Sequence, residues 1–195
     1  MTGCSGCIKS GIVGGIILFI WSAISWMALP WHMATLHGFN DEVAVEQIIV
    51  ANTPKSGIYV MPMKQMDMKQ AASDAASSSS SSTTSTATST TTTPQIFASV
   101  NLKGMGSSMA MPMVIAVIYL IIAACLVAWM LSKTVGLGYL NRVGFVVVFG
   151  IAVAILSALP CWNWFGFALN YSMVMMADII IGWFLAGLVM AKMGR

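Results

Sequence analysis

Methionine is the residue type that most suggests chemistry in this sequence. The chain has 17 methionines, and two segments, MPMKQMDM at 61–68 and MGSSMAMPM at 105–113, contain the pattern Met-x-Met. Thioether sulfur is a soft ligand that suits Cu(I), and two nearby histidines could add imidazole ligands. Methionine is also a flexible apolar filler, so packing alone is the alternative. The candidate copper ligands in this region are Met61, Met63, Met66, Met68, Met109, Met111, Met113, His32 and His37.

A second candidate metal site is the pair Cys4 and Cys7 in the opening segment MTGCSGC. If this end of the chain is cytoplasmic, its thiols stay reduced, which favours free thiols or metal binding over a disulfide. The alternative is that the two cysteines flank a membrane span without any shared function.

Asp178 is the third candidate, because it is the one acid in the apolar run MMADIIIGWFLA at 175–186. An unpaired charge inside a membrane costs about 2.5–3.5 kcal/mol on insertion scales, so Asp178 should face other helices or be protonated. Ser22, Ser25 and Tyr119 are expected at similar depth, and we predict a polar layer in which they, or a tryptophan N–H, donate to Asp178. No cation is expected at that level. Asp178 could lock helices together, form a proton or ion site, or contact a cation on a partner protein.

The composition identifies the elements that must position these residues. Of 195 residues, 58% are hydrophobic and 8% are charged, and the mean hydropathy is +0.85. Soluble domains carry roughly 25% charged residues, so this is the composition of a membrane protein. Apolar runs of about 20 residues cross a membrane as helices, because backbone groups in lipid must be paired within the segment. The predicted spans are residues 11–31, 112–131, 144–160 and 172–191, which makes an all-α membrane protein of four transmembrane helices.

The placement of charge predicts the orientation of the spans. Basic residues without acids occur in 1–10, 132–143 and 192–195, whereas five of the six acids occur in 32–111. The positive-inside rule therefore places both termini and the loop 132–143 in the cytoplasm. Residues 32–111 become an extracytoplasmic loop, and residues 161–171 a short outer loop rich in aromatic residues.

The long loop is predicted to hold a small α+β module. We expect a helix over 41–51 and strands over about 57–62 and 95–102, the latter with alternating polarity. Residues 71–94 are nearly all Ser, Thr and Ala, a composition that predicts a disordered linker. The ordered part of this module is too small for a core of its own, so it should rest on helix ends or on a partner.

Small residues recur at helical spacing in two of the predicted spans. Gly11 and Gly15 share one helix face, and so do Gly182 and Ala186. Small residues at such spacing let membrane helices approach closely, so both stripes are expected at helix–helix contacts.

Several longer segments resemble a known group of proteins. WSAISWMALPWH, ANTPKSGIYVMP, LPCWNWFGFALNYS and ADIIIGWFLAGLVMAK resemble a family of small four-span bacterial inner-membrane proteins. This resemblance implies a multi-pass protein of the bacterial inner membrane and implies no particular activity. The CSGC start and the Met-rich segments do not belong to the family's pattern.

Known catalytic motifs are missing from the sequence, which has no G-x-S-x-G, no H-E-x2-H and no phosphate-binding loop. We therefore expect a non-enzymatic accessory or scaffold subunit of a membrane complex, with no cofactor. Its expected partners are the lipid bilayer and other membrane proteins or further copies of itself, and not nucleic acid. A copper-handling membrane protein, and a small transporter or proton pathway built on Asp178, are the alternatives.

Overall fold

The computed structural model describes residues 3–61, 94–104, 106, 108–134 and 136–193. The chain forms two compact units, one from residues 1–40 and 106–195 and the other from residues 41–105. Each unit is described by itself below. The predicted linker, residues 71–94, lies almost wholly outside the described residues.

The first unit contains four long apolar helices: α1 (Gly3–Met27), α4 (Ala110–Ser132), α5 (Tyr139–Phe165) and α6 (Leu169–Met193). All four are long and apolar enough to cross a membrane. The predicted fold class, four membrane helices with a small helix-and-strand module between the first two, is confirmed. The chain is a multi-pass membrane protein.

The helix α5 is longer than the predicted span 144–160, because it continues through Pro160 to Phe165. Gly166 ends the helix in the left-handed conformation, with φ 70° and its N–H bonded to the carbonyl of Cys161. Glycine adopts this conformation without a steric penalty and is therefore a common helix terminator.

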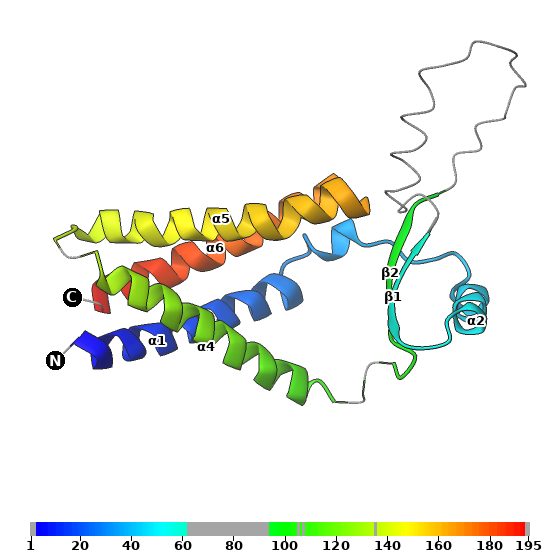
Figure 1. Ribbon diagram of the computed structural model, residues 1–195, viewed down its shortest axis with the longest axis horizontal. Coiled ribbons are helices and arrows are strands. Elements are labelled where there is room, and N and C mark those ends of the chain that lie inside the picture. The colour runs from blue at the N-terminus through cyan, green and yellow to red at the C-terminus, as the bar shows by residue number, and fades with distance from the viewer. Residues whose placement is uncertain (1–2, 62–93, 105, 107, 135, 194–195) are drawn as a thin grey trace, which may run out of the picture. The chain divides into compact units, whose positions relative to one another are not determined.

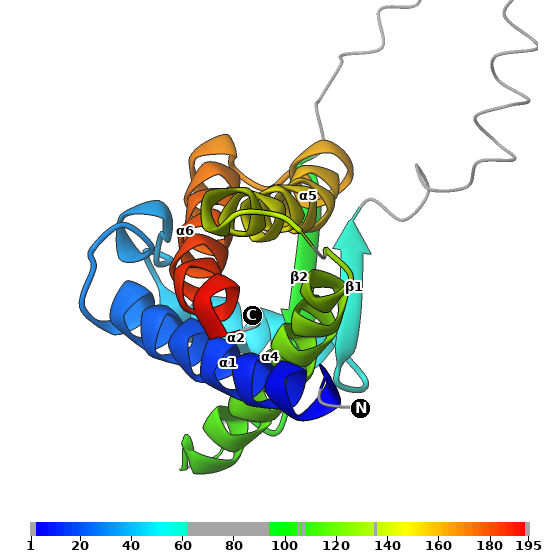
Figure 2. The ribbon, with the colours of Figure 1, turned by 90° about the vertical axis from the view of Figure 1, so that its left-hand side faces the viewer.

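Neighbouring helices run antiparallel, so both termini lie at one end of the bundle, here called the termini end (Figure 1). The opposite end, where α1 and α5 finish and α4 and α6 begin, is called the loop end. The helix α1 packs against α4 and α6, and α5 packs against α6. In contrast, α4 and α5 separate as they leave their connecting turn (Figures 1 and 2).

An apolar core fills the bundle toward the termini end. Its largest fully buried side chains include Leu131 and Val127 of α4, Val146 of α5 and Met190 of α6. These side chains come from separate helices, so their burial holds the helices together in the membrane through close packing.

Glycines bring α1 close to its neighbours, as the small-residue pattern predicted. A Cβ at Gly11 would lie 2.6 Å from the Cα of Cys125, and one at Gly15 would lie 2.5 Å from the Cα of Ile121. Both distances are far below van der Waals contact, so any side chain there would push α1 away from α4. The prediction of close helix approach at this stripe is confirmed.

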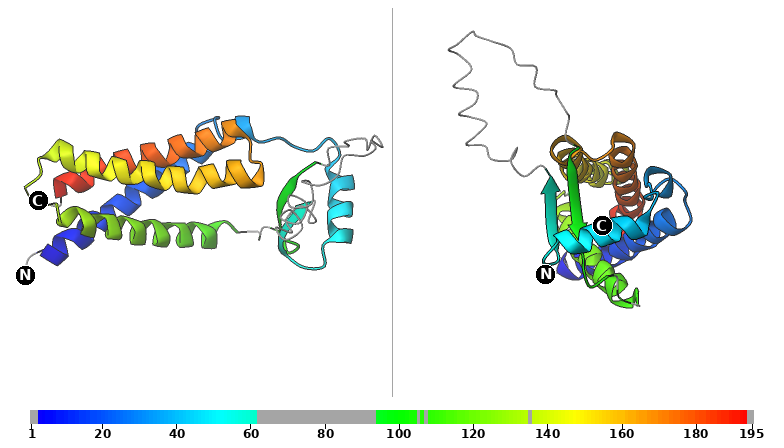
Figure 3. Two further views of the ribbon diagram at one scale, coloured as in Figure 1. Left: turned by 45° about the horizontal axis from the view of Figure 1, so that its top comes forward. Right: turned by 90° about the vertical axis from the view of Figure 1, so that its right-hand side faces the viewer.

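The second unit consists of α2 (Glu42–Asn52) and the antiparallel pair β1 (Gly57–Met61) and β2 (Ile96–Val100). The side chain of Asp41 caps α2 by accepting a hydrogen bond from the N–H of Ala44 at 3.0 Å. The strands pair with Gly57 opposite Val100 and Met61 opposite Ile96. Figure 3 shows the short helix beside the two strands.

Candidate functional site

A buried histidine and a buried aspartate meet in the first unit. His32 is 0% exposed and Asp178 is 9% exposed. The His32 Nε2 atom lies 3.6 Å from Asp178 Oδ2, within ion-pair distance if the imidazole is protonated. This contact corrects the expectation that no Lys, Arg or His of the chain would lie at the level of Asp178.

The chain places His32 here by turning back on α1. After α1 ends at Met27, the N–H of Ala34 bonds to the carbonyl of Pro30 at 2.9 Å, and a short 3-10 helix covers Met33–Thr35. The Thr35 hydroxyl and the Thr35 N–H both bond to the carbonyl of His32, at 2.7 and 3.0 Å. These local bonds hold the turn in which the His32 side chain returns to the bundle.

Three tryptophans surround the imidazole and its neighbours. The Trp26 ring stacks on the His32 ring with centroids 3.9 Å apart and planes 8° apart. The Trp31 ring meets His32 edge-on at 5.6 Å and meets Trp21 edge-on at 6.2 Å. The imidazole therefore lies in an aromatic enclosure, and its surroundings exclude most of the solvent.

Ser25 joins the aromatic enclosure to His32 by hydrogen bonds. The Ser25 Oγ atom lies 3.0 Å from His32 Nε2, and it accepts a hydrogen bond from Trp31 Nε1, also at 3.0 Å. Ser25 is itself fully buried. His32, Ser25, Asp178, Trp21, Trp26 and Trp31 are called the His–Asp cluster below.

The helix α6 comes close enough to form this cluster because of a glycine. Trp21 lies one turn before Ser25 on α1, and its Nε1 donates to the backbone carbonyl of Asp178 at 3.0 Å. Gly182 lies one turn after Asp178, and a Cβ there would lie 3.0 Å from Trp21 Cδ1. A larger residue at 182 would displace the indole and weaken this bond.

The geometry favours one protonation pattern for His32. Ser25 Oγ and Asp178 Oδ2 both face Nε2, whereas Nδ1 has no hydrogen-bond partner among the described residues. A hydrogen on Nε2 can be shared between these two oxygens, but a bare Nε2 would leave its lone pair facing a carboxylate. We therefore assign the Nε2–H form, as the neutral tautomer or the imidazolium.

This arrangement differs from a hydrolytic triad despite containing Ser, His and Asp. In a triad the acid bonds to Nδ1 and orients the ring while Nε2 faces the serine. Here the acid and the serine both face Nε2. The serine is also fully buried, so a substrate cannot reach it in this geometry.

The structure brings together part of the predicted polar layer. Ser25 joins the cluster, but through His32 and Trp31. Ser22 is half-buried on α1 and makes no described hydrogen bond to Asp178. Tyr119 is 57% exposed on α4 and makes no described bond to Asp178 either. Asp178 Oδ1 has no hydrogen-bond partner among the described residues.

The candidate copper ligands are dispersed where they are described. Met63, Met66 and Met68 lie outside the described residues, as does the side chain of Cys4. Met109, Met111 and Met113 are exposed at the start of α4, and Met111 cannot share a helix face with the other two. His37 is exposed, Met61 ends β1, and Cys7 lies in α1. In the described parts of the chain no three His, Cys, Asp or Glu side chains cluster as metal ligands would.

Sequence reasoning named His32 only as a candidate copper ligand and missed its contact with Asp178, because it placed this residue in the loop beyond the first span. A signal was nevertheless present in the order Pro30-Trp31-His32 directly after an apolar helix. A proline at this position ends the helix and favours a turn, and only a turn lets the next side chains fold back onto the helix.

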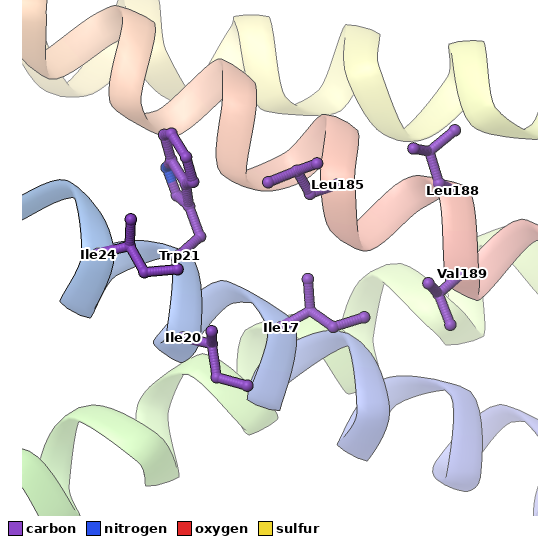
Figure 4. A pocket seen from close by; sticks show the side chains of 7 residues that line it. All are labelled: Ile17, Ile20, Trp21, Ile24, Leu185, Leu188 and Val189. Atoms are coloured by element: carbon purple, nitrogen blue, oxygen red, sulfur yellow. The ribbon is translucent and has the colours of Figure 1, made fainter. Parts of the chain in front are cut away.

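A cavity of about 320 Å³ lies beside the cluster, between α1 and α6 (Figure 4). Its walls are aliphatic except for Trp21, whose N–H is already bonded to Asp178. The cavity therefore offers packing surface and no further hydrogen-bonding group. The lining residues are Ile17, Ile20, Trp21, Ile24, Leu185, Leu188 and Val189.

Comparisons with known proteins assign no family to the chain. No protein-family model matches it, and neither the curated proteins nor the solved structures give a significant match. The four long apolar helices are consistent with a four-span membrane protein.

Proposed function

We propose that this chain is a non-enzymatic accessory or scaffold subunit of a membrane complex, and that it binds its partner through residues 41–105. In this proposal the four helices anchor the protein in a bacterial inner membrane. The termini lie in the cytoplasm and residues 41–105 lie outside, as the distribution of basic residues indicates.

The observation that carries the proposal is that the described residues of the second unit, 41–61 and 94–104, bury almost no apolar side chain. The helix α2 has no buried residue, and its Val43, Ile48 and Val50 are 57–64% exposed. On the hairpin, Ile58 is 59% and Ile96 45% exposed. An isolated two-stranded hairpin is marginally stable in water, so these apolar side chains need a covering surface.

The hairpin also supports binding through its backbone. In the described chain β1 pairs only with β2, so each strand has one edge that no other described strand covers. Such an edge can accept an extended segment of another protein as an additional strand.

The His–Asp cluster has a positioning role in this proposal. It fixes His32 to α6, and His32 precedes residues 41–105 in the chain by nine residues. A fixed attachment point restricts the conformations of the loop before a partner binds. Less conformational entropy is then lost on binding, which favours binding.

The alternative functions have less support. A proton pathway needs polar groups across the membrane, but apolar side chains such as Leu18, Val127, Leu131 and Val146 fill the described core beyond Asp178. A copper site needs converging ligands, and the described candidates do not converge.

Site-specific photo-crosslinking in intact cells tests the proposal. A benzophenone amino acid is placed at Ile58 or at Val43, and the matched control replaces Leu156, a 75% exposed residue of α5. The proposal expects Ile58 or Val43 to give a discrete protein adduct and expects lipid adducts from Leu156. If both positions give only lipid adducts or none, partner binding by this unit is ruled out.

A further inference from the structure

A cavity of about 260 Å³ opens between α5 and α6, away from the His–Asp cluster. Cys161 comes from α5, Phe167 from the connecting turn, and Tyr171, Ser172, Met175 and Ile179 from α6. Most of these side chains are half-buried, so molecules in the membrane can reach the cavity from the side.

The cavity is elongated along α6. Tyr171, Ser172, Met175 and Ile179 follow the spacing of one helix face, and Ser172 and Ile179 are separated by about 10 Å along the axis. The 25 residues of α6 span about 37 Å, more than the ~30 Å hydrocarbon core, so an end of α6 extends into the interfacial region. Ser172 lies in the first turn of α6 and is therefore nearer to a membrane boundary than Ile179.

Ser172, at the end of the cavity near the start of α6, has a hydroxyl without a described hydrogen-bond partner. Its side chain is 2% exposed, and its Oγ has no hydrogen-bond partner among the described residues. Two neighbouring polar side chains already bond to backbone carbonyls, because Ser157 Oγ donates to the carbonyl of Ala154 at 3.2 Å and Cys161 Sγ to that of Ser157 at 3.4 Å. A buried hydroxyl without a partner costs free energy, so Ser172 is poised to bond to a group that enters the cavity.

Water alone is a poor occupant of this space. A buried water needs two to four polar partners, and Ser172 supplies the one uncommitted buried hydroxyl of this wall. A single oxygen carried on an apolar body meets the same hydroxyl without leaving further polar groups unpaired. Ser172 is one of the residues that line the cavity.

We infer that the α5–α6 cavity binds the acyl chain of a lipid, with its carbonyl or carboxylate oxygen accepting a hydrogen bond from Ser172. The chain runs past Met175 toward Ile179, in the direction that a lipid tail takes from the interface inward. The ring of Tyr171, which lies 5.8 Å from that of Phe167, flanks the head of the chain.

The cavity between α1 and α6 provides a matched comparison. It is somewhat larger, but its one polar group, the Trp21 N–H, is already bonded to the Asp178 carbonyl. It can contact lipid tails but cannot hold a head oxygen. Saturable binding is therefore expected only between α5 and α6.

Photolabelling of the full chain in nanodiscs of an ether-linked phospholipid, which lacks the acyl carbonyl oxygens that would compete for Ser172, tests the inference. One arm uses palmitic acid carrying a diazirine near its chain end, and the other uses phosphatidylcholine carrying the same labelled chain. Adducts are located by mass spectrometry. In at least one arm, labelling around Met175–Ile179 should saturate, whereas labelling around Ile17–Ile24 should rise linearly with probe concentration. The arm that saturates identifies a free acid or a phospholipid as the source of the chain.

Two variants separate a head-binding site from a passive groove. Ser172→Ala should raise the probe concentration at half-saturation about three- to tenfold, which is the effect of losing one hydrogen bond. Ile179→Trp should abolish saturable labelling by filling the deep end. Ile20→Trp fills the other groove and should leave α5–α6 labelling unchanged. Thermal unfolding confirms that each variant is folded.

Linear labelling at α5–α6 in both arms would overturn the inference. Saturable labelling that Ser172→Ala leaves unchanged would also overturn the assigned role of the hydroxyl. Because the test does not involve residues 41–105, its outcome is independent of partner binding by that unit.

Discussion

His32 Nε2 has two oxygen atoms within reach, and His32 Nδ1 has none among the described residues. The imidazole therefore interacts with the bundle through one nitrogen, and Asp178 and Ser25 compete for the same hydrogen. Coupling between His32 and Asp178 should consequently be measurable as a pairwise energy.

A double-mutant cycle tests this coupling. Asp178→Ala and His32→Ala should each lower the free energy of unfolding in detergent, and the two losses should overlap by about 1–2 kcal/mol in the double variant. Asp178→Asn should retain most of the stability, because an amide oxygen still accepts from Nε2–H. Strictly additive losses would show that the 3.6 Å contact contributes nothing.

Ser25 and Ser22 give a second test on the same helix. Ser25→Ala removes the hydroxyl partner of His32 and the closer acceptor of Trp31 Nε1, and leaves the Ser25 carbonyl at 3.3 Å as its other acceptor. The free energy of unfolding should therefore fall by about 1–3 kcal/mol. Ser22→Ala, at a half-buried position without a described bond, should change it by less than about 0.5 kcal/mol. Equal effects would contradict the hydrogen bonding assigned here.

Sequence reasoning at this scale identified Asp178 as a helix-facing residue with a tryptophan N–H and Ser25 nearby, but not its closest partner. Burial of a charge in an apolar helix follows from solvation alone. The position of His32 depends on how the chain turns after Pro30, which periodicity does not encode. Tyr119 was predicted to donate to Asp178 and makes no described bond to it, because equal depth in the membrane does not place two residues on facing helix surfaces.

At the scale of elements, glycine decides which helices approach closely. A Cβ at Gly15 would meet the backbone of α4, whereas a Cβ at Gly144 of α5 would meet nothing within 4 Å. The apolar runs were enough to predict the four helices, and the Gly11–Gly15 stripe correctly indicated a close helix–helix contact. The sequence did not predict that this stripe faces α4, because the spacing of small residues specifies a helix face and not the helix that packs against it.

Gly15→Ala and Gly144→Ala form a matched pair for this argument. Gly15→Ala should destabilise the bundle by about 1–3 kcal/mol, because α1 must move away from Ile121. Gly144→Ala should be neutral or stabilise the protein by up to about 1 kcal/mol through helix propensity. Unfolding in increasing SDS, followed by circular dichroism, measures both. A tolerated Gly15→Ala would argue against the α1–α4 contact.

At the scale of the whole molecule, the proposed orientation depends on charge distribution and is open to direct measurement. In a background lacking the native cysteines, Gln47→Cys should react with a membrane-impermeant maleimide in spheroplasts. Leu137→Cys, in the loop between α4 and α5, should react only after lysis. The opposite labelling pattern would reverse the proposed topology and the proposed side of partner binding.

The attachment of residues 41–105 has a mechanical consequence. On the N-terminal side, the His32–Asp178 contact fastens the chain to α6, although His32 belongs to the segment that follows α1. On the C-terminal side, the chain continues directly into α4. Tension applied to residues 41–105 is therefore carried by α4 at one end and, at the other end, by α1 and through the His32–Asp178 contact by α6. Pulling would load the α1–α4 and α1–α6 contacts first and leave α5 to follow α6.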